Sequence, residues 1–130
     1  MDKEVKITII DDDEELVDAI KTYLQRKGFL VSFAYSGEEG LEVIRREKPQ
    51  LVILDFLMPK MNGIQVLKEL RKDNYFKNIP VIMLTAKENE IDKILCPELG
   101  NYQYIIKPLD MNILLRQVRN VLEKEEKGEL

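Results

Sequence analysis

Short apolar runs alternate along the chain with segments in which apolar residues recur every three or four positions. The apolar runs cover residues 5–10, 30–34, 51–54, 81–84 and 104–106, which are typical strand lengths. The other segments have the period of an amphipathic helix. Residues 51–54 are apolar throughout, as expected of a parallel strand with both faces covered. The pattern predicts five successive strand–helix units.

Capping residues predict where several of the helices begin and end. Gly28 ends a first helix over residues 14–27, and Ser36 with Glu39 three positions later has the form of a capping box. Asn62 and Asp110 are suitable N-caps for two later helices. A further helix is expected around residues 90–99, and the charged residues from 123 to 130 are expected to fray.

Alternating strands and helices over 130 residues predict one doubly wound α/β domain. Its parallel sheet would have right-handed crossovers and helices on both faces. In such sheets ligands bind beyond the carboxyl ends of the strands. The residues that follow each strand are therefore the first candidates for a functional site.

Polar side chains stand at the ends of four predicted strands. Asp11 and Asp12 end the first, Asp55 the third, Thr85 the fourth and Lys107 the fifth. Two carboxylates about 4 Å apart repel by roughly 4 kcal/mol at an effective dielectric constant near 20. The ammonium group would offset part of this repulsion, and a hard divalent cation such as Mg²⁺ would offset the rest. Together these groups are typical of phosphoryl transfer, with a carboxylate as the nucleophile.

Each of these residues also has an ordinary structural explanation. The acidic run DDDEE is more often a capped helix start than a metal site, because carboxylates stabilise a helix N-terminus. Asp55 is more often a turn residue than a nucleophile. Thr85 could cap a helix, and Lys107 could be a solvated charge. The functional hypothesis rests on their coincidence at one edge of the sheet.

Composition excludes several functional classes. The net charge of −4 and the dispersed basic residues indicate no nucleic-acid interface and no attachment to an anionic membrane. No apolar run has the length of a membrane span, and the N-terminus does not resemble a signal peptide. Cys96 is the only cysteine, and histidine is absent, which excludes histidine-based catalysis on this chain. We therefore expect a cytoplasmic protein.

Four segments resemble the motifs of the response-regulator receiver domain in their usual order. They are IIDDDEE, LVILDFLMPKMNG, VIMLTA and YIIKP. The resemblance extends over essentially the whole chain, and the 22-residue step from Thr85 to Lys107 leaves no room for an insertion. It implies a flavodoxin-like (βα)5 fold with strand order 2-1-3-4-5. The receiver domain would be residues 1–124, followed by a flexible charged tail over residues 125–130.

The resemblance also assigns a role to each acidic residue. Asp55 would accept a phosphoryl group from a phosphohistidine and become an aspartyl phosphate. Asp12 would bind Mg²⁺ directly and Asp11 largely through water, with Asp55 and the backbone carbonyl of Leu57 as further ligands. Mn²⁺ is an alternative ion for the same site.

The remaining motif residues would bind the phosphoryl group and transmit its presence. The Thr85 hydroxyl and the Lys107 ammonium would donate to phosphoryl oxygens. Tyr104 would be the switch aromatic that turns inward when Thr85 moves. The Lys107-Pro108 bond would be cis, and Pro59 with Gly63 would shape the loop beside Asp55.

The implied protein is a signalling phosphoacceptor rather than an enzyme. Its partners would be a histidine kinase or histidine phosphotransfer protein, and an effector or second copy bound through the fourth helix, fifth strand and last helix. The chain would be either a stand-alone regulator or a receiver excised from a DNA-binding or enzymatic regulator. Self-dephosphorylation is expected to be slow, because Leu57 has no side-chain group to hold water and Lys87 could shield the site.

Two departures from the family pattern and two competing hypotheses remain. Pro97 lies inside the predicted fourth helix, and Asn101 replaces a residue that is small and apolar in the family pattern. Both are expected on the surface of the fourth helix, fifth strand and last helix that would bind the effector. A haloacid-dehalogenase-like phosphohydrolase would explain Asp11-x-Asp13 but would leave Asp55 without a role. A pseudo-receiver that only binds partners would leave the complete set of motif residues without a role.

Overall fold

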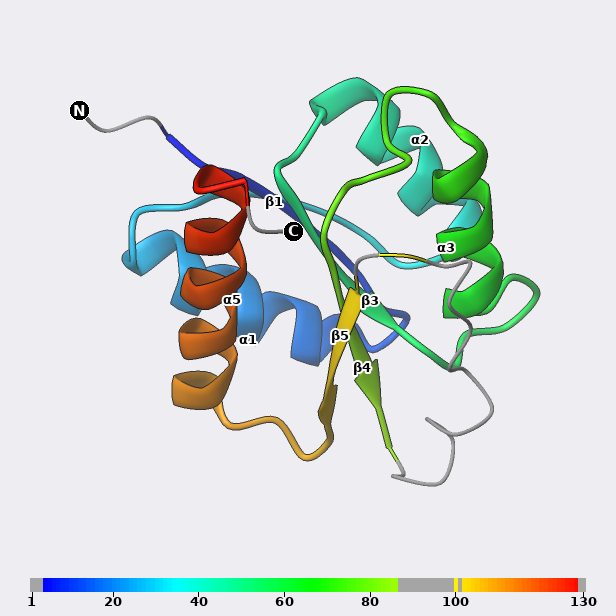
Figure 1. Ribbon diagram of the computed structural model, residues 1–130. Helices are drawn as coiled ribbons and strands as arrows, with labels where there is room; N and C mark the ends of the chain where they lie inside the picture. Colours follow the sequence, from blue (N-terminus) through cyan, green and yellow to red (C-terminus); the bar gives the residue numbers. More distant parts are fainter. Residues whose placement is uncertain (1–3, 87–99, 101, 129–130) are drawn as a thin grey trace.

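The computed structural model describes residues 4–86, 100 and 102–128, and shows a parallel five-stranded sheet between two layers of helices (Figure 1). The strand order is β2-β1-β3-β4-β5. The predicted doubly wound, flavodoxin-like fold is therefore confirmed, including the predicted order. The strands are β1 (Lys6–Ile10), β2 (Leu30–Ala34), β3 (Leu51–Asp55), β4 (Val81–Thr85) and β5 (Tyr102–Ile106).

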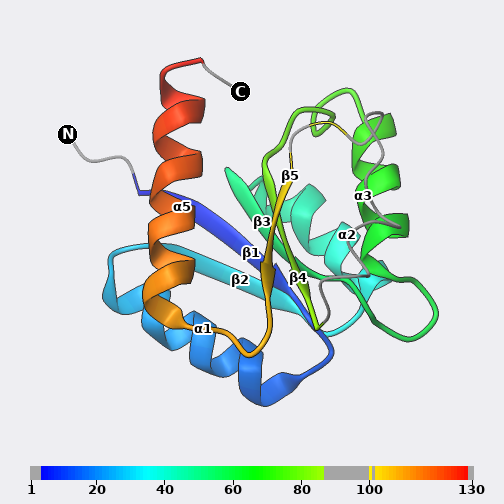
Figure 2. The ribbon, with the colours of Figure 1, turned by 60° about the horizontal axis from the view of Figure 1, so that its bottom comes forward.

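The described helices cover both faces of the sheet (Figure 2). α1 (Glu14–Arg26) and α5 (Met111–Glu126) lie on one face, and α2 (Gly37–Glu47) and α3 (Gly63–Lys72) lie on the other. None of these helices combines the length and apolarity that crossing a membrane requires. The predicted fourth helix, with Cys96 and Pro97, lies outside the described residues, as do Lys87 and Asn101.

Two apolar cores form because the side chains of each strand alternate between the faces of the sheet. Both Ile9 and Ile53 point to the face covered by α1 and α5, whereas Ile10 and Leu54 point to the face covered by α2 and α3. All four are fully buried. This explains why the central strands are apolar at nearly every position and why they provide a rigid base for the residues at their ends.

The predicted N-caps are present, and one of them differs in detail from the prediction. The Asn62 side chain accepts from the Gln65 N–H, and the Gln65 side chain accepts from the Asn62 N–H, so these residues form a full capping box. Ser36 accepts from the Glu39 N–H, as predicted. The Glu39 carboxylate, however, accepts from the N–H of Tyr35 at 3.1 Å, one residue before the cap.

Several element boundaries differ from those expected; α1, for example, ends at Arg26 rather than at residue 27. β1 begins at Lys6 rather than at residue 5. β5 begins at Tyr102, two residues earlier than predicted, because Tyr102 pairs with Val81 of β4. α5 continues to Glu126, beyond the domain boundary predicted at residue 124 and into the stretch expected to fray. Its last turn consists of good helix formers, and Lys127 forms an ion pair with Glu123 one turn earlier.

Candidate functional site

The polar residues predicted at the strand ends lie at the carboxyl edge of the sheet. Asp11 directly follows β1, Asp55 is the last residue of β3, Thr85 is the last of β4, and Lys107 directly follows β5. Because β3 lies between β1 and β4, Asp55 occupies the middle of this edge. The sheet order thus places residues that are distant in the sequence around one carboxylate.

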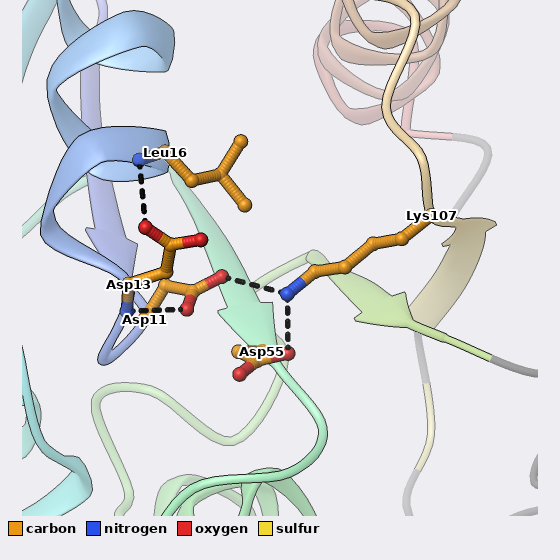
Figure 3. A network of polar contacts seen from close by, with 5 residues as sticks. All are labelled: Asp11, Asp13, Leu16, Asp55 and Lys107. Atoms are coloured by element: carbon orange, nitrogen blue, oxygen red, sulfur yellow. Dashed lines mark hydrogen bonds and ion pairs between the residues drawn. The ribbon is translucent and has the colours of Figure 1, made fainter.

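Lys107 contacts two of the carboxylates at once (Figure 3). Its Nζ atom lies 3.1 Å from Asp55 Oδ1 and 3.2 Å from Asp11 Oδ2. Asp11 is completely buried and Asp55 is only 5% exposed, whereas the lysine side chain remains partly accessible. Buried charges need such partners, because water no longer solvates them. The ammonium group therefore stabilises both acids.

Backbone hydrogen bonds hold the two ends of this ion pair. The Asp13 N–H donates to Asp11 Oδ1 at 2.9 Å, and the Lys107 N–H donates to the Thr85 carbonyl at 2.7 Å. Asp13 itself caps α1 by accepting from the Leu16 N–H, and does not join the carboxylate cluster (Figure 3). The Lys107-Pro108 peptide bond is cis, as predicted.

Asp11, Asp12 and Asp55 form a cluster with metal-binding composition. One carboxylate oxygen from each lies within 4.8 Å of the others. Asp12 is exposed, whereas the other two are buried, so the cluster is open to solvent on one side. If all three are ionised, Lys107 neutralises only one charge. Oxygen ligands with surplus negative charge fit a hard divalent cation such as Mg²⁺, which retains several of its waters.

Burial and neighbouring charges change the protonation of the central groups. The pKa of Asp55 is raised from 3.8 to about 7; burial is the largest cause, the negative charge of Asp11 adds to it, and Lys107 opposes both. Burial alone would lower the pKa of Lys107, but Asp55 and Asp11 outweigh it, and the pKa is raised overall. Lys107 therefore remains charged at neutral pH, whereas Asp55 in the absence of metal takes up a proton near neutrality.

Thr85 and Tyr104 occupy neighbouring strands. Thr85 is buried and lies opposite Ile106 in the β4–β5 register, and Tyr104 lies opposite Met83. Tyr104 is 42% exposed, so part of its surface is accessible to solvent. Leu57 also has an exposed side chain in the loop after β3.

Gly63 allows α3 to begin directly beside Asp55. Its N–H donates to the Phe56 carbonyl at 2.9 Å. A Cβ atom at this position would overlap the backbone carbonyl oxygen of Asp55 and lie 2.9 Å from Met83 Sδ. Sequence reasoning placed Gly63 in this loop but missed its neighbour Gln65, whose position three residues after Asn62 was the available signal.

Comparison with known proteins assigns the chain to one family. A model described as the response regulator receiver domain matches residues 7–119. The chain belongs to this family. The match and the use of Asp13 as a helix cap argue against a haloacid-dehalogenase-like enzyme, in which Asp13 would act beside Asp11.

Individual relatives agree with this assignment. Over 121 residues the chain is 40% identical to the alkaline phosphatase synthesis transcriptional regulatory protein PhoP of Bacillus subtilis, covering 93% of this chain and 50% of the relative. The receiver thus spans about half the length of that protein. A CheY-like receiver domain protein of Methanospirillum hungatei superimposes with a TM-score of 0.88 at 28% identity, covering 97% and 99% of the two chains.

Vibrio cholerae chemotaxis protein CheY4 superimposes with a TM-score of 0.85 at 26% identity, covering 92% of this chain and 99% of CheY4. Receiver-domain folds of this kind thus occur in proteins named for transcription and for chemotaxis. Family membership therefore identifies a signalling module without specifying its output.

Proposed function

We propose that this chain is the phosphoacceptor of a two-component or phosphorelay system, with Asp55 as the phosphorylated residue. The observation that carries the proposal is the position of Asp55 at the end of the central strand, between two further acids and Lys107. The partner would be a histidine kinase or a histidine phosphotransfer protein. The receiver would comprise residues 1–124 together with the last turn of α5, which ends at Glu126, and the residues after Glu126 would form the tail.

Asp11, Asp12 and Asp55 would hold the Mg²⁺ ion, with the backbone carbonyl of Leu57 as a further ligand and Mn²⁺ as an alternative ion. Bound metal supplies positive charge that neutralises phosphoryl oxygens and favours the ionised form of carboxylates. Since the pKa of Asp55 is raised to about 7 without metal, this charge would increase the ionised fraction of the nucleophile.

The chemical step is a displacement at phosphorus. A carboxylate oxygen of Asp55 attacks the phosphorus atom of the partner's phosphohistidine, and a new O–P bond forms as the P–N bond breaks. The electron pair of the broken bond stays on the imidazole nitrogen, and the ring leaves as neutral imidazole when its other nitrogen carries a proton. Lys107 and Thr85 donate hydrogen bonds to the phosphoryl oxygens, which carry the developing charge.

The aspartyl phosphate would then bias a two-state switch. Phosphorylation adds roughly one to two negative charges beside Lys107 and Thr85. Drawing the Thr85 hydroxyl toward the phosphoryl group would leave room for Tyr104, here exposed, to turn inward. The surface formed by the predicted fourth helix, β5 and α5 would change with it and bind an effector or a second copy.

Covalent labelling tests this proposal. Incubation with acetyl phosphate and Mg²⁺ should add one phosphoryl group to the wild-type chain, measured by intact mass. Asp55→Asn should remain unlabelled, and Asp12→Ala should be labelled at least tenfold more slowly. Equal labelling of Asp55→Asn and wild type would show that the acceptor lies elsewhere.

The phosphorylated state should decay slowly. The exposed aliphatic side chain of Leu57 provides no group to orient an attacking water beside Asp55. After removal of acetyl phosphate, the label should persist for minutes or longer in buffer with Mg²⁺. Decay within seconds would contradict this expectation.

A further inference from the structure

β2 forms one edge of the sheet and lacks the features that usually protect such edges (Figure 2). Natural edge strands are commonly blunted by lysine, proline or a bulge. The sequence of β2 is LVSFA, which contains neither a charged residue nor proline. Leu30 and Phe33 are 43% and 36% exposed, and Tyr35 directly beyond the strand is similarly exposed. This edge is therefore suited to pairing with another strand.

The backbone of β2 offers two residues to such a partner. The Leu30 N–H donates to the Val5 carbonyl, and the Ala34 carbonyl accepts from the Asp11 N–H, so both residues face β1. Successive residues of a strand direct their hydrogen-bonding groups to opposite sides. Val31 and Phe33 therefore direct their N–H and carbonyl groups to the open edge. The next outward N–H, that of Tyr35, is occupied by the Glu39 carboxylate.

We propose that β2 pairs antiparallel with β2 of a second copy of this chain, with the twofold axis at Ser32. In this register Val31 faces Phe33 of the second copy and Phe33 faces Val31, so each pair exchanges two backbone hydrogen bonds. The available edge is symmetric about Ser32, which makes it complementary to itself. The two sheets become one continuous sheet.

The side chains of this register also match. Val31 packs against the core beneath α1 and α5, and Phe33 lies under Lys21 of α1, whose Nζ atom is 4.9 Å from the ring centroid. Both side chains therefore lie on the α1 face of the sheet. Cross-strand pairs of an aromatic with a β-branched residue are among the favourable ones in antiparallel sheets. The symmetric arrangement forms this pair twice.

A surface hollow beside β2 accommodates the residue that follows the paired segment. Its volume is about 550 Å³, and its lining includes Phe29, Leu30 and Gln25. In a register centred on Ser32, Tyr35 of the second copy comes opposite Phe29 at this hollow. Tyr35 is exposed in the single chain, so its ring would be covered on pairing.

Charge favours a second copy over an unrelated strand. The twofold axis sets α1 antiparallel to α1 of the second copy, and α2 antiparallel to its own counterpart. Both helices have acidic first turns and basic last turns, so opposite charges come side by side in each pair. The acidic residues are Glu14 and Glu15 in α1 and Glu38 and Glu39 in α2; the basic residues are Arg26 in α1 and Arg45 and Arg46 in α2.

This contact leaves the phosphorylation site free. β2 and β5 lie at opposite edges of the sheet, and Asp55 lies at the end of the central strand. The pairing therefore adds to any interaction made through β5 and α5, and one chain could take part in both.

Cysteine cross-linking tests the register. In the predicted dimer Ser32 faces itself in a non-hydrogen-bonded pair, with Cα atoms about 4.5 Å apart, within the range of a disulfide. Leu30 would be separated from Leu30 of the second copy by roughly 13 Å along the strands. With Cys96 replaced by serine in both variants, Ser32→Cys should form a disulfide-linked dimer under mild oxidation. Leu30→Cys is the matched control and should form no disulfide-linked dimer.

Sedimentation of the intact chain provides the second measurement. The apparent mass should rise toward twice the monomer mass as the concentration approaches about 1 mM, at which an interface with a Kd near 0.1 mM is mostly occupied. Phe33→Lys should abolish this rise, whereas Tyr75→Lys, at an exposed aromatic on the α3–β4 connection, should preserve it. A monomer at all concentrations, or equal cross-linking of the two cysteine variants, would overturn the proposal.

Discussion

Asp55 has two requirements that conflict. It is buried at the end of the strand between β1 and β4, yet the proposed role as nucleophile requires it to be ionised. Burial is the main reason that its pKa rises to about 7, and Asp11 adds to the effect. The positive charge of Lys107 opposes both increases in the pKa, but this one ammonium group is shared between Asp55 and Asp11. A second positive charge at this position would therefore stabilise both the fold and the reactive form.

The raised pKa predicts a pH-dependent gain in stability for Asp55→Asn. Because the folded chain holds the Asp55 proton more tightly than the unfolded chain, the contribution of Asp55 to stability decreases as pH rises from about 4 to about 7. Asparagine does not titrate. In buffer with a chelator, Asp55→Asn should be more stable than wild type by on the order of 1–3 kcal/mol at pH 8, and the difference should shrink toward pH 5. Urea unfolding at both pH values measures this.

Asp18→Asn is the control for Asp55→Asn. Asp18 lies on the surface of α1 with its side chain 74% exposed, so the same change of charge should have little effect at either pH. Unchanged or lower stability of Asp55→Asn at pH 8 would contradict the electrostatic explanation.

The sequence predicted which residues gather at the site but not how their side chains meet. Strand ends can be predicted from the ends of apolar runs. Because parallel strands place their carboxyl ends at one edge of the sheet, the acids and Lys107 were expected to lie close together. The contact of one ammonium with both Asp11 and Asp55 depends on side-chain conformation and could not be predicted. The partial exposure of Tyr104 depends on side-chain conformation as well.

The start of α3 has little tolerance for added volume. Gly63→Ala would push a methyl group against the backbone beside Asp55, which cannot move away as a side chain could. We expect a loss of about 1–3 kcal/mol in stability and a slower rate of labelling by acetyl phosphate. Thermal melting and the initial labelling rate measure the two effects.

Gly40→Ala serves as the matched control in α2. A Cβ atom there would meet the side chain of Ile10, which points into the core beneath α2 and α3. This variant should also lose stability, but its labelling rate with saturating Mg²⁺ should remain close to that of wild type. If both variants label at the wild-type rate, the close approach of α3 does not position Asp55.

Element boundaries were harder to predict than element types. The central strands were located to within one residue because their apolar runs end sharply at polar residues. β5 begins earlier than predicted because Gln103 interrupts its apolar run, yet this residue pairs with Ile82 of β4. α5 extends further than expected because its final residues favour helix on their own and need no apolar contacts.

The strand order places three surfaces at different sides of the molecule. The carboxylate site lies at the carboxyl edge of the sheet, the open β2 strand lies on one side, and β5 lies on the other. Alternating strands and helices predicted the parallel sheet, but the order 2-1-3-4-5 followed only from the family resemblance. The periodicity of apolar residues cannot specify the strand order, because right-handed crossovers are compatible with more than one order of the strands in the sheet.

The dependence of labelling on Mg²⁺ is the most direct test of the central claim that the acidic cluster captures a cation and thereby makes Asp55 reactive. The initial rate of acetyl phosphate labelling should be near background in chelator, rise with Mg²⁺ concentration and saturate, and peptide mapping should locate the label on Asp55. A rate independent of Mg²⁺, or a label on any other residue, would contradict this account.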